Sequence, residues 1–427
     1  MLTLRQRFPG LRPLRHRDFA LYWTGLTVSI VGDWMETTTT AWLLYEITKS
    51  PVLLGVGGAL RASAIIVFGL IGGAIADRFQ RRRLLFITQS AFALSSLALG
   101  LLVVTGRVEF WHIYVFNLVN GTIGSFDAPA RRSLFPTLVP RAEMQNAVML
   151  NASIFRLGRL IGPGLAGVII AVYGPAVAYF VNVASYAAIL VALAAMRVRE
   201  SPLAPEAPLL RAAAQGLRYS LERPLLRSVL ALESIHSFFG VNTALITILA
   251  SDVLQAGPQG LGLLLSSQAV GALLGTGFLV MTGDLERKGR AMMISGTAYC
   301  LAFAALALAT SFELAAFLIA VCGLADALWT TMRNTIFQLQ TDEAYRGRAM
   351  GVILLAGRGF TQASQLETGF AVSLGGPAFA MLFGAGAIAA SLVAVNATTD
   401  EVRSYRGTPD LGATIAAGAE PPGSGGG

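Results

Sequence analysis

The sequence predicts an all-α membrane protein whose twelve transmembrane helices form two pseudo-symmetric six-helix halves. Three observations lead to this fold class. Apolar residues make up 54% of the 427 residues and charged residues only 13%, whereas soluble domains usually have about 25% charged residues. The apolar residues fall in runs of roughly 20 residues or more, the helix length that crosses a ~30 Å hydrocarbon core. The first and second parts of the chain also share residues at matching positions.

The twelve expected spans are apolar runs separated by short polar or basic stretches. Six runs lie near residues 19–47, 51–76, 84–105, 110–130, 144–173 and 175–196. Six more lie near residues 225–250, 260–282, 291–310, 312–332, 349–372 and 377–395. The runs lack the alternation of polar and apolar residues that is typical of a transmembrane strand, so every span is expected to be a helix.

These runs divide the chain into four regions. We expect an N-terminal six-helix half (1–196), a cytoplasmic linker (197–224), a C-terminal six-helix half (225–395) and a cytoplasmic tail (396–427). The linker combines the segment SPLAPEAP with a basic, helix-like stretch. The tail ends in AEPPGSGGG, a composition that buries too little apolar surface to fold, so it is expected to be disordered.

Basic residues set the expected orientation. Of the 32 lysines and arginines, 26 lie in segments that share one side of the membrane when the N-terminus is inside, and only Lys49 and Arg107 lie on the other side. Arg131 and Arg333, directly after the fourth and tenth expected spans, are counted among these 26. Because basic loops stay in the cytoplasm, we expect a multi-pass protein of the cell (inner) membrane with both termini cytoplasmic. This bias also accounts for the net charge of +8 without a nucleic-acid partner. The expected partners are the lipid bilayer, a small-molecule substrate and protons, and the chain is expected to be a monomer.

The two halves also carry a weak internal repeat. The segment DRFQRRR, from Asp77, matches DLERKGR, from Asp284, after the second span of each half. Two repeated halves of this kind are typical of secondary transporters, whose substrate site lies near the membrane midplane between them. A shift of 202 residues superposes four further pairs: Arg131 on Arg333, Phe135 on Phe337, Ala147 on Ala349, and Arg156 on Arg358.

Charged residues inside the apolar runs predict a polar interior. A charge at the bilayer centre costs about 2.5–3.5 kcal/mol, so it normally faces a partner or a wet cavity. In the first span, Ser29, Asp33 and Thr37 recur at every fourth position and therefore share one face of a helix. Glu36 and Arg61 are expected at similar depth, where they would form a pair. The residues predicted to form the substrate or proton pathway are Asp33, Glu36, Arg61, Arg156, Glu233, His236, Arg358 and Gln362.

The loop after the second span resembles a signature of the major facilitator superfamily. In GGAIADRFQRRR, the matching residues are Gly73, Asp77, Arg78 and Arg81, while Gln80 stands where the family usually has a second glycine. The resemblance implies the major facilitator fold. It also implies that these charges clamp the cytoplasmic ends of the two halves when the cavity opens outward. A role in topology alone is the alternative.

The fifth span resembles the helix-5 signature of exporters in the same superfamily. The segment GRLIGPGLAG matches it at Gly158, Gly162, Pro163 and Gly167, and the resemblance implies efflux; plain helix packing is the alternative. Small residues at every fourth position let another helix approach closely, and Pro163 bends the helix. Because Arg159 lies nearer this glycine stripe than Arg156, Arg156 is the arginine expected to face the cavity.

The resemblance narrows further to the branch that contains siderophore exporters and macrolide efflux proteins, on the segments VSIVGDWM, FDAPARRSLFPTLVP and IFRLGRLIGPGLAG. It implies a proton-coupled antiporter that exports a small organic molecule, siderophore-like or drug-like, by alternating access. Separately, Arg156 and Arg358 would bring two positive charges from opposite halves into the cavity, which suits an anionic or catechol-like substrate. Many proton-coupled members have an arginine where this chain has Asn117, so the proton would bind at Asp33, Glu36 or Glu233. A purely structural role of these acids stays an alternative.

The sequence lacks the residues that other function classes require. Three histidines and two cysteines show no metal-ligand spacing, and no nucleotide-binding loop is present, so we expect neither an enzyme nor a nucleotide-driven pump. No metal site and no cofactor are expected, and the proton gradient is the expected energy source. A solute importer, or a flippase for lipids or lysolipids with the same fold, remains the main alternative to an exporter.

Overall fold

The computed structural model describes the backbone of residues 9–197 and 209–407; the side chains of residues 9, 70–78, 209–213 and 358 lie outside the description. In this part of the chain the structure is helical throughout, without strands. The N-terminal set comprises α2 (Arg17–Thr48), α3 (Pro51–Arg78), α4 (Arg81–Val104), α5 (Phe110–Leu134), α6 (Met144–Tyr173) and α7 (Pro175–Ala195). Short 3-10 segments precede α2 (Pro9–Arg15) and α6 (Phe135–Leu138 and Arg141–Glu143).

The second set follows a connecting helix, α8 (Leu209–Glu222). It begins with α9 (Pro224–Phe239), which continues after a short break as α10 (Thr243–Ile248) and a turn of π-helix, η4 (Leu249–Val253). The remaining helices are α11 (Gly257–Thr282), α12 (Lys288–Leu306), α13 (Phe312–Gln340), α14 (Arg346–Thr398) and the short α15 (Glu401–Ser404).

Helix α14 is two helices joined by a sharp bend. Gly376 has a φ of 81°, a left-handed conformation that glycine adopts without steric cost, and Pro377 starts the second part. This bend lies where the sequence separates the last two expected spans. Within the described residues, nine helical stretches are long and apolar enough to cross a membrane, with α14 counted as one. The protein is therefore a multi-pass membrane protein.

The predicted count of twelve spans depends on three further considerations. The bend makes two spans of α14, while α2 and α5 have 32 and 25 residues but are too polar to be counted by composition. Both helices carry polar residues on the side that faces the interior of the molecule. The count of twelve stays a prediction, and so do the exact domain boundaries.

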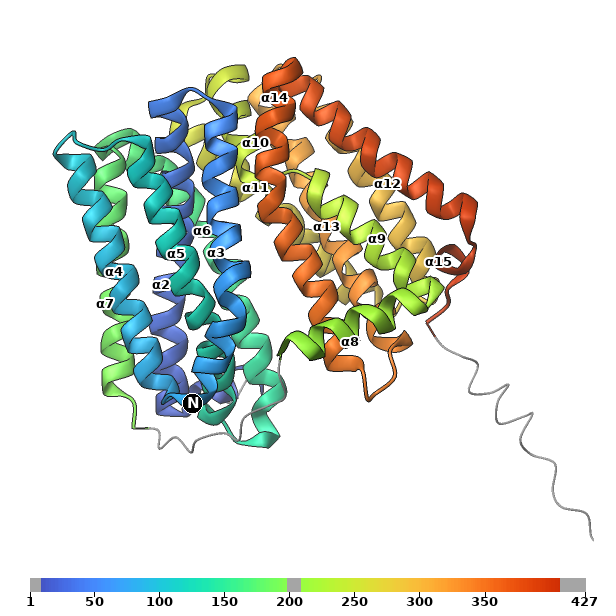
Figure 1. Cartoon of the computed structure of the whole chain (residues 1–427), viewed down its shortest axis with the longest axis horizontal. Coiled ribbons are helices and arrows are strands. Elements are labelled where there is room, and N and C mark those ends of the chain that lie inside the picture. The colour runs from blue at the N-terminus through green and yellow to red at the C-terminus, as the bar shows by residue number, and fades with distance from the viewer. Residues whose placement is uncertain (1–8, 198–208, 408–427) are drawn as a thin grey trace, which may run out of the picture.

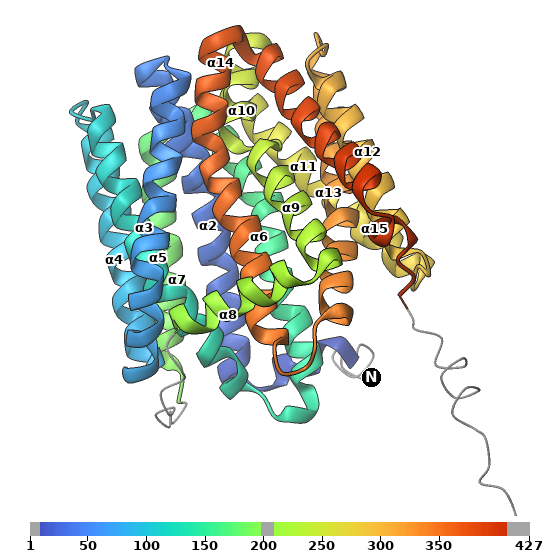
Figure 2. The same cartoon turned by 45° about the vertical axis from the view of Figure 1, so that its right-hand side comes forward.

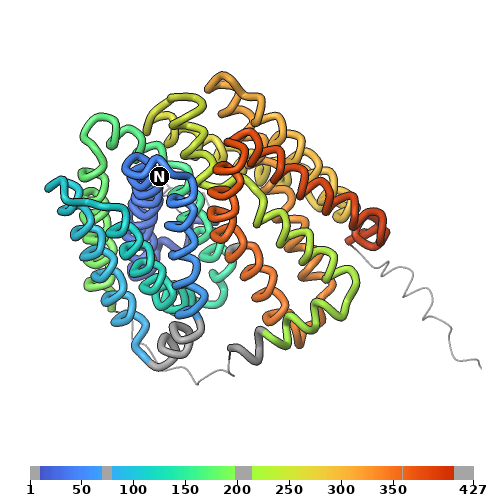
Figure 3. Tube along the Cα trace, turned by 45° about the horizontal axis from the view of Figure 1, so that its top comes forward, coloured from blue at the N-terminus to red at the C-terminus, as the bar shows by residue number. Residues whose placement is uncertain are grey.

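The two sets of helices lie side by side, as the blue-to-green and yellow-to-red ribbons show (Figures 1 and 2). The same division is visible when the top of the molecule comes forward (Figure 3). We call the sets the N half and the C half. The linker end is the end of the molecule that carries α8 and the loop before α14, at the bottom of Figure 1; the closed end is the opposite one.

Contacts between the halves concentrate toward the closed end. A Cβ atom on Gly55 would lie 2.4 Å from the Gln365 carbonyl oxygen, and one on Gly369 would lie 2.5 Å from that of Pro51. The Tyr45 hydroxyl donates a hydrogen bond to the Asp252 carboxylate across the same seam. The start of α3 and the middle of α14 therefore touch backbone to backbone at this end.

The predicted disordered tail needs one correction. Residues 399–407 are described and contact the rest of the C half: Val402 is buried, and the Gly407 amide donates to the Glu286 carbonyl at 3.0 Å. The sequence did not predict this packing, because one buried valine and a backbone hydrogen bond do not change the overall composition of the segment. The remainder of the predicted tail, 408–427, and most of the predicted linker, 198–208, lie outside the described residues.

Candidate functional site: a cavity between the two halves

A cavity of about 470 Å³ lies between the halves. Helices α2, α3, α5 and α6 line it from the N half, and α10, α11 and α14 line it from the C half. Its wall combines apolar, amide, hydroxyl and charged side chains. The lining residues include Asp33, Trp34, Arg61, Arg131, Arg159, Pro163, Asn242, Gln268, Thr361, Gln362 and Gln365.

The charged side chains that the structure describes in this cavity belong to one half. Among the side chains that the structure describes, the charged lining residues are Asp33, Arg61, Arg131 and Arg159, all from the N half. The C half contributes amides, hydroxyls and apolar groups. Three lining arginines stand against one lining aspartate, and Asp127, behind the lining, neutralises Arg131. The described lining therefore keeps an excess of positive charge, and low-dielectric walls strengthen the field of such charges.

Asp33 lies at the cavity wall as the sequence predicts. The Tyr186 hydroxyl of α7 donates a hydrogen bond of 2.6 Å to its carboxylate. Arg131 and Arg61 both act on it electrostatically. Asp33 is thus a solvent-reachable acid held in place by one neighbour and faced by two cations.

Arg131 is a cavity residue that the sequence analysis placed among the loop arginines. It lies in the last turn of α5 and forms an ion pair with Asp127, which is 0% exposed. Asp127 also accepts hydrogen bonds from Thr88 at 3.0 Å and Gln89 at 2.8 Å. The spacing of Asp127 and Arg131, four residues apart on one helix, is the sequence signal that could have identified this pair.

On α6, the cavity-lining arginine is Arg159, so the preference for Arg156 is wrong. Arg159 donates a 2.9 Å hydrogen bond to Gln268 of α11 and lies 5.9 Å from the centre of the Trp34 ring. Arg156 is exposed and is not among the lining residues. The sequence could not show that α6 packs with two faces, because each face is defined by its partner helix.

The exporter-like motif of α6 serves both of those faces. Added Cβ atoms on Gly158 and Gly162 would lie 2.6 Å from Ile30 and Trp34 of α2. An added Cβ atom on Gly167 would lie 2.6 Å from the Pro258 carbonyl oxygen of α11. Gly158 and Gly162 therefore pack within the N half, whereas Pro163 and Gly167, in line with Arg159, face the C half.

Glu36 does not pair with Arg61, contrary to expectation. Its carboxylate is 4% exposed and accepts hydrogen bonds from neutral donors: Ser96, Asn182 at 2.8 Å and Asn120 at 3.3 Å. Arg61 instead lines the cavity, with no hydrogen bond or ion pair to any residue that the structure describes. Similar depth in neighbouring helices was not enough to predict a contact, because the two side chains leave their helices on different faces.

Glu233 and His236 lie in a sealed cluster of the C half, away from the cavity. Glu233 forms an ion pair with Arg333 of α13, and Trp329 and Ser237 each donate to it at 2.9 Å. His236 lies 3.3 Å from Asp326 and packs against two aromatic rings. The sequence analysis had counted Arg333 with the cytoplasmic arginines, whereas it is almost fully buried.

The remaining predicted residues divide into three groups. Gln362 lines the cavity and accepts a 2.9 Å hydrogen bond from Gln365. Arg81 starts α4 and is buried, but the side chains of Gly73, Asp77 and Arg78 lie outside the description. The same holds for the side chain of Arg358. In the described part of the chain, no group of three or more metal-ligating side chains comes together.

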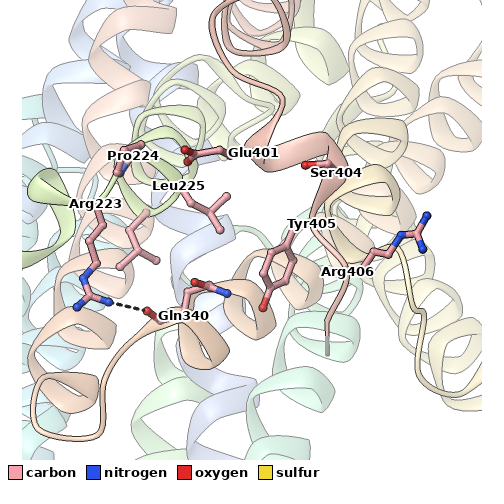
Figure 4. A pocket seen from close by; sticks show the side chains of 9 residues that line it. Arg223, Pro224, Leu225, Gln340, Glu401, Ser404, Tyr405 and Arg406 are labelled. Atoms are coloured by element: carbon pink, nitrogen blue, oxygen red, sulfur yellow. Dashed lines mark hydrogen bonds between the residues drawn. The ribbon is translucent and has the colours of Figure 1, made fainter. Parts of the chain in front are cut away.

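A second cavity, of about 540 Å³, lies at the linker end within the C half, between the start of α9, the end of α13 and α15. Arg223 and Arg406 lie on opposite sides of it (Figure 4). The Arg223 guanidinium is already engaged, since it donates to the Gln340 carbonyl at 3.4 Å and to Asp342 at 2.6 Å. This cavity does not reach the seam between the halves.

Comparison with solved structures supports the fold. The nucleoside transporter NupG is 15% identical, with a TM-score of 0.68 over 90% of this chain and 98% of that one. A bacterial homologue of the lysosomal transporter Spinster, in an inward-facing conformation, is 14% identical, with a TM-score of 0.62 over 90% of this chain and 95% of that one. At such identities the likeness concerns the fold alone.

Curated relatives are exporters. The enterobactin exporter EntS of Citrobacter koseri is 25% identical over 388 residues, which cover 86% of this chain and 92% of the relative. EntS of Shigella boydii serotype 4 is 25% identical over 337 residues, which cover 79% and 81%. A major facilitator superfamily model described as "Transmembrane secretion effector" matches residues 9–405. The chain therefore belongs to this transmembrane secretion effector family of the major facilitator superfamily, and it is a membrane transporter rather than an enzyme.

Proposed function

We propose that this transporter exports a small organic anion from the cytoplasm in exchange for protons. The observation that carries the proposal is the positive charge that the described lining side chains leave available in the central cavity: Arg61 and Arg159 face a single lining acid, Asp33, while Arg131 is paired with Asp127. Hydrogen bonds between arginine and a carboxylate or phenolate are about twice as strong as neutral ones. Trp34 and Phe155 add aromatic surface to the same wall, which suits a siderophore-like or other aromatic anion.

The transport cycle is alternating access. The linker end, on the basic side of the molecule, faces the cytoplasm together with both termini, and the contacts at the closed end separate the cavity from the outside. The halves rock about the cavity, and the Asp77, Arg78 and Arg81 cluster clamps the linker end when the cavity opens outward. The chain acts as a monomer in the cell membrane.

Asp33 is the proposed proton-binding acid. It is the acid among the described side chains that lines the cavity, and two arginines compete with the proton for it. In the exchange, Asp33 takes up a proton from outside after the anion has left and releases it to the cytoplasm before Arg61 and Arg159 bind the next anion. Glu36 and Glu233 are held by complete sets of internal partners and have the supporting roles of keeping α2 and α9 in place.

Sealed inverted vesicles provide the test. An imposed proton gradient should drive uptake of an organic anion, with enterobactin and carboxyfluorescein as anionic probes and a neutral macrolide and a lysophospholipid as comparisons. Anion accumulation that ignores the gradient contradicts antiport. Preference for the lysophospholipid would favour a flippase, and gradient-driven loss of a preloaded solute would favour an importer.

A further inference from the structure

Two hydrogen bonds join α6 of the N half to α11 of the C half at the edge of the cavity. The Arg159 guanidinium donates to the side-chain oxygen of Gln268 at 2.9 Å. The Ser266 hydroxyl donates to the Leu160 carbonyl at 2.8 Å. We call this pair of contacts the α6–α11 link. Because Arg159 and Gln268 both line the cavity, anything that binds there lies beside the link.

The link lies between the close backbone contacts of α6 with α11 and the cavity. Toward the closed end, an added Cβ atom on Gly262 would lie 2.3 Å from the Pro163 carbonyl oxygen, and one on Gly167 would lie 2.6 Å from that of Pro258. The helices are therefore in backbone contact up to the link. Pro163 has no N–H group to donate to the Arg159 carbonyl four residues earlier, and such a missing bond is a common cause of a bend in a helix. Arg159 therefore lies at the point of α6 where a bend is most easily accommodated.

The Arg159 charge is compensated differently from that of Arg131. Arg131 has an ion pair with the fully buried Asp127. The hydrogen bond of Arg159 goes to a neutral amide, and the guanidinium lies against the face of Trp34. Asp326 acts on Arg159 electrostatically but forms no ion pair with it. A charged acceptor binds a guanidinium more strongly than a neutral one. An anion that enters the cavity can therefore displace Gln268 from Arg159, whereas it cannot readily displace Asp127 from Arg131.

We propose that Arg159 senses the substrate: an organic anion draws the guanidinium away from Gln268, breaks the link and frees α6 to pivot at Pro163. This inference rests on the proposed function, since it requires an anionic substrate in the cavity. It makes Arg159 a binding residue and Gln268 a positioning residue that competes with the substrate. Occupancy of the cavity then lowers the barrier to the rearrangement of the two halves, and an empty carrier stays held by the link.

The test separates binding from conformational change. Spin labels at Thr137 and Glu343, exposed positions in the linker-end loops of opposite halves, report the distance between the halves in a background with Cys300 and Cys322 changed to alanine. Affinity for enterobactin and carboxyfluorescein is measured on the same purified proteins. The variants are Gln268→Ala, Arg159→Gln and, as a matched control, Ser266→Ala, which removes the neighbouring hydrogen bond without touching the guanidinium.

The proposal predicts three distinct results. Gln268→Ala shifts the distance distribution without ligand and binds the anions at least as tightly as the wild type, because the competitor is gone. Arg159→Gln also shifts the distribution but loses about tenfold or more in affinity, as expected for a lost charge-assisted contact. Ser266→Ala shifts the unliganded distribution more weakly and leaves affinity unchanged.

Two results would overturn the proposal. An unchanged distance distribution in unliganded Gln268→Ala would show that the link does not hold the halves. An affinity loss in Gln268→Ala as large as that in Arg159→Gln would show that Gln268 binds the substrate rather than competing with it. Failure of the proposed function looks different: the wild type then binds neither anion. In that case Arg159 cannot sense an anion. The distance distributions of the unliganded variants still show whether the link holds the halves together.

Discussion

The two halves supply different chemistry to the same cavity. The N half contributes the charged lining residues among the described side chains, Asp33, Arg61, Arg131 and Arg159, while the C half contributes amides and hydroxyls such as Asn242 and Gln362. A duplicated architecture therefore does not imply a duplicated site. In the proposed function, the N half attracts the charged solute, and the C half provides neutral hydrogen-bonding groups that suit many orientations of it.

Two arginines that are related by the internal repeat illustrate this difference between the halves. Arg131 and Arg333 occupy equivalent positions, 202 residues apart. Arg131 lines the cavity and pairs with an acid on its own helix. Arg333 is buried and pairs with Glu233 on another helix. The same residue type at the same repeat position thus serves the cavity in one half and joins two helices in the other.

The largest effect is expected on the stability of the C half. Glu233→Gln leaves the Arg333 charge buried without its carboxylate, and breaking a buried ion pair in this way costs about 3–5 kcal/mol. Thermal unfolding of the purified protein in detergent should show a clearly lower transition temperature. Glu367→Gln, which changes a partly exposed acid of the same half, is the control. Equal transition temperatures for the two variants would contradict the structural role of the pair.

The next effect concerns coupling in the N half. Asp33→Asn keeps an acceptor for Tyr186 but removes the proton-binding group. We expect proton-driven anion uptake into inverted vesicles to be abolished, whereas exchange of anion for anion without a gradient continues. Glu36→Gln should retain proton-driven uptake if Asp33 is the coupling acid. Proton-driven uptake by Asp33→Asn at the wild-type rate would remove Asp33 from the mechanism.

Packing inside the N half gives an effect of intermediate size. Gly162→Ala would place a methyl group 2.6 Å from Trp34 and 2.7 Å from the Val31 carbonyl oxygen, and overpacking of this kind costs about 1–3 kcal/mol. The control is Gly164→Ala, where the nearest atom, the Ser266 hydroxyl oxygen, is 3.3 Å away. Thermal unfolding should distinguish the two alanine variants. If both unfold at the wild-type temperature, α2 and α6 are less tightly packed than described.

A smaller effect is expected at Arg61, a cavity arginine with no hydrogen bond or ion pair to a described residue. Arg61→Gln removes a charge without such a contact, so folding should be unaffected while anion affinity falls about tenfold, or ~1.4 kcal/mol. Arg61→Lys retains the charge and should lose less. Calorimetric titration with enterobactin or carboxyfluorescein measures both. A stability loss without an affinity loss would argue that Arg61 is structural.

The smallest effect is expected at Arg156. Because this side chain is exposed and does not line the cavity, Arg156→Gln should change anion affinity and transport rate by no more than about twofold, ~0.5 kcal/mol. Arg159→Gln, three residues further on, provides the contrast in the same titration. A larger loss at Arg156 than at Arg159 would mean that the lining of α6 is assigned to the wrong face.

The sequence predicts helix type and position well, because a hydrocarbon core imposes both length and composition. The break between the last two spans was expected near Pro377 and lies at Gly376. Arg131 and Arg333 were misread as loop residues, because a count of basic residues near helix ends does not distinguish the last turn of a helix from the loop after it.

The candidate site could be predicted only in part. Asp33, Arg61 and Gln362 line the cavity, and their role in a substrate or proton pathway stays a prediction. The choice of Arg156 over Arg159 and the pairing of Glu36 with Arg61 were wrong, because they depend on which neighbour each helix face meets. The Glu36 network draws donors from three other helices, and no spacing within a single helix encodes it.

Anion affinity of two double variants tests the central claim most directly. In calorimetric titrations with the same anion, the charged N-half wall is removed by Arg61→Gln with Arg159→Gln, and the neutral C-half wall by Gln362→Ala with Gln365→Ala. We expect about a hundredfold loss of affinity for the first double variant and less than about fivefold for the second. The opposite order, or equal losses, would contradict the assignment of anion binding to the N half.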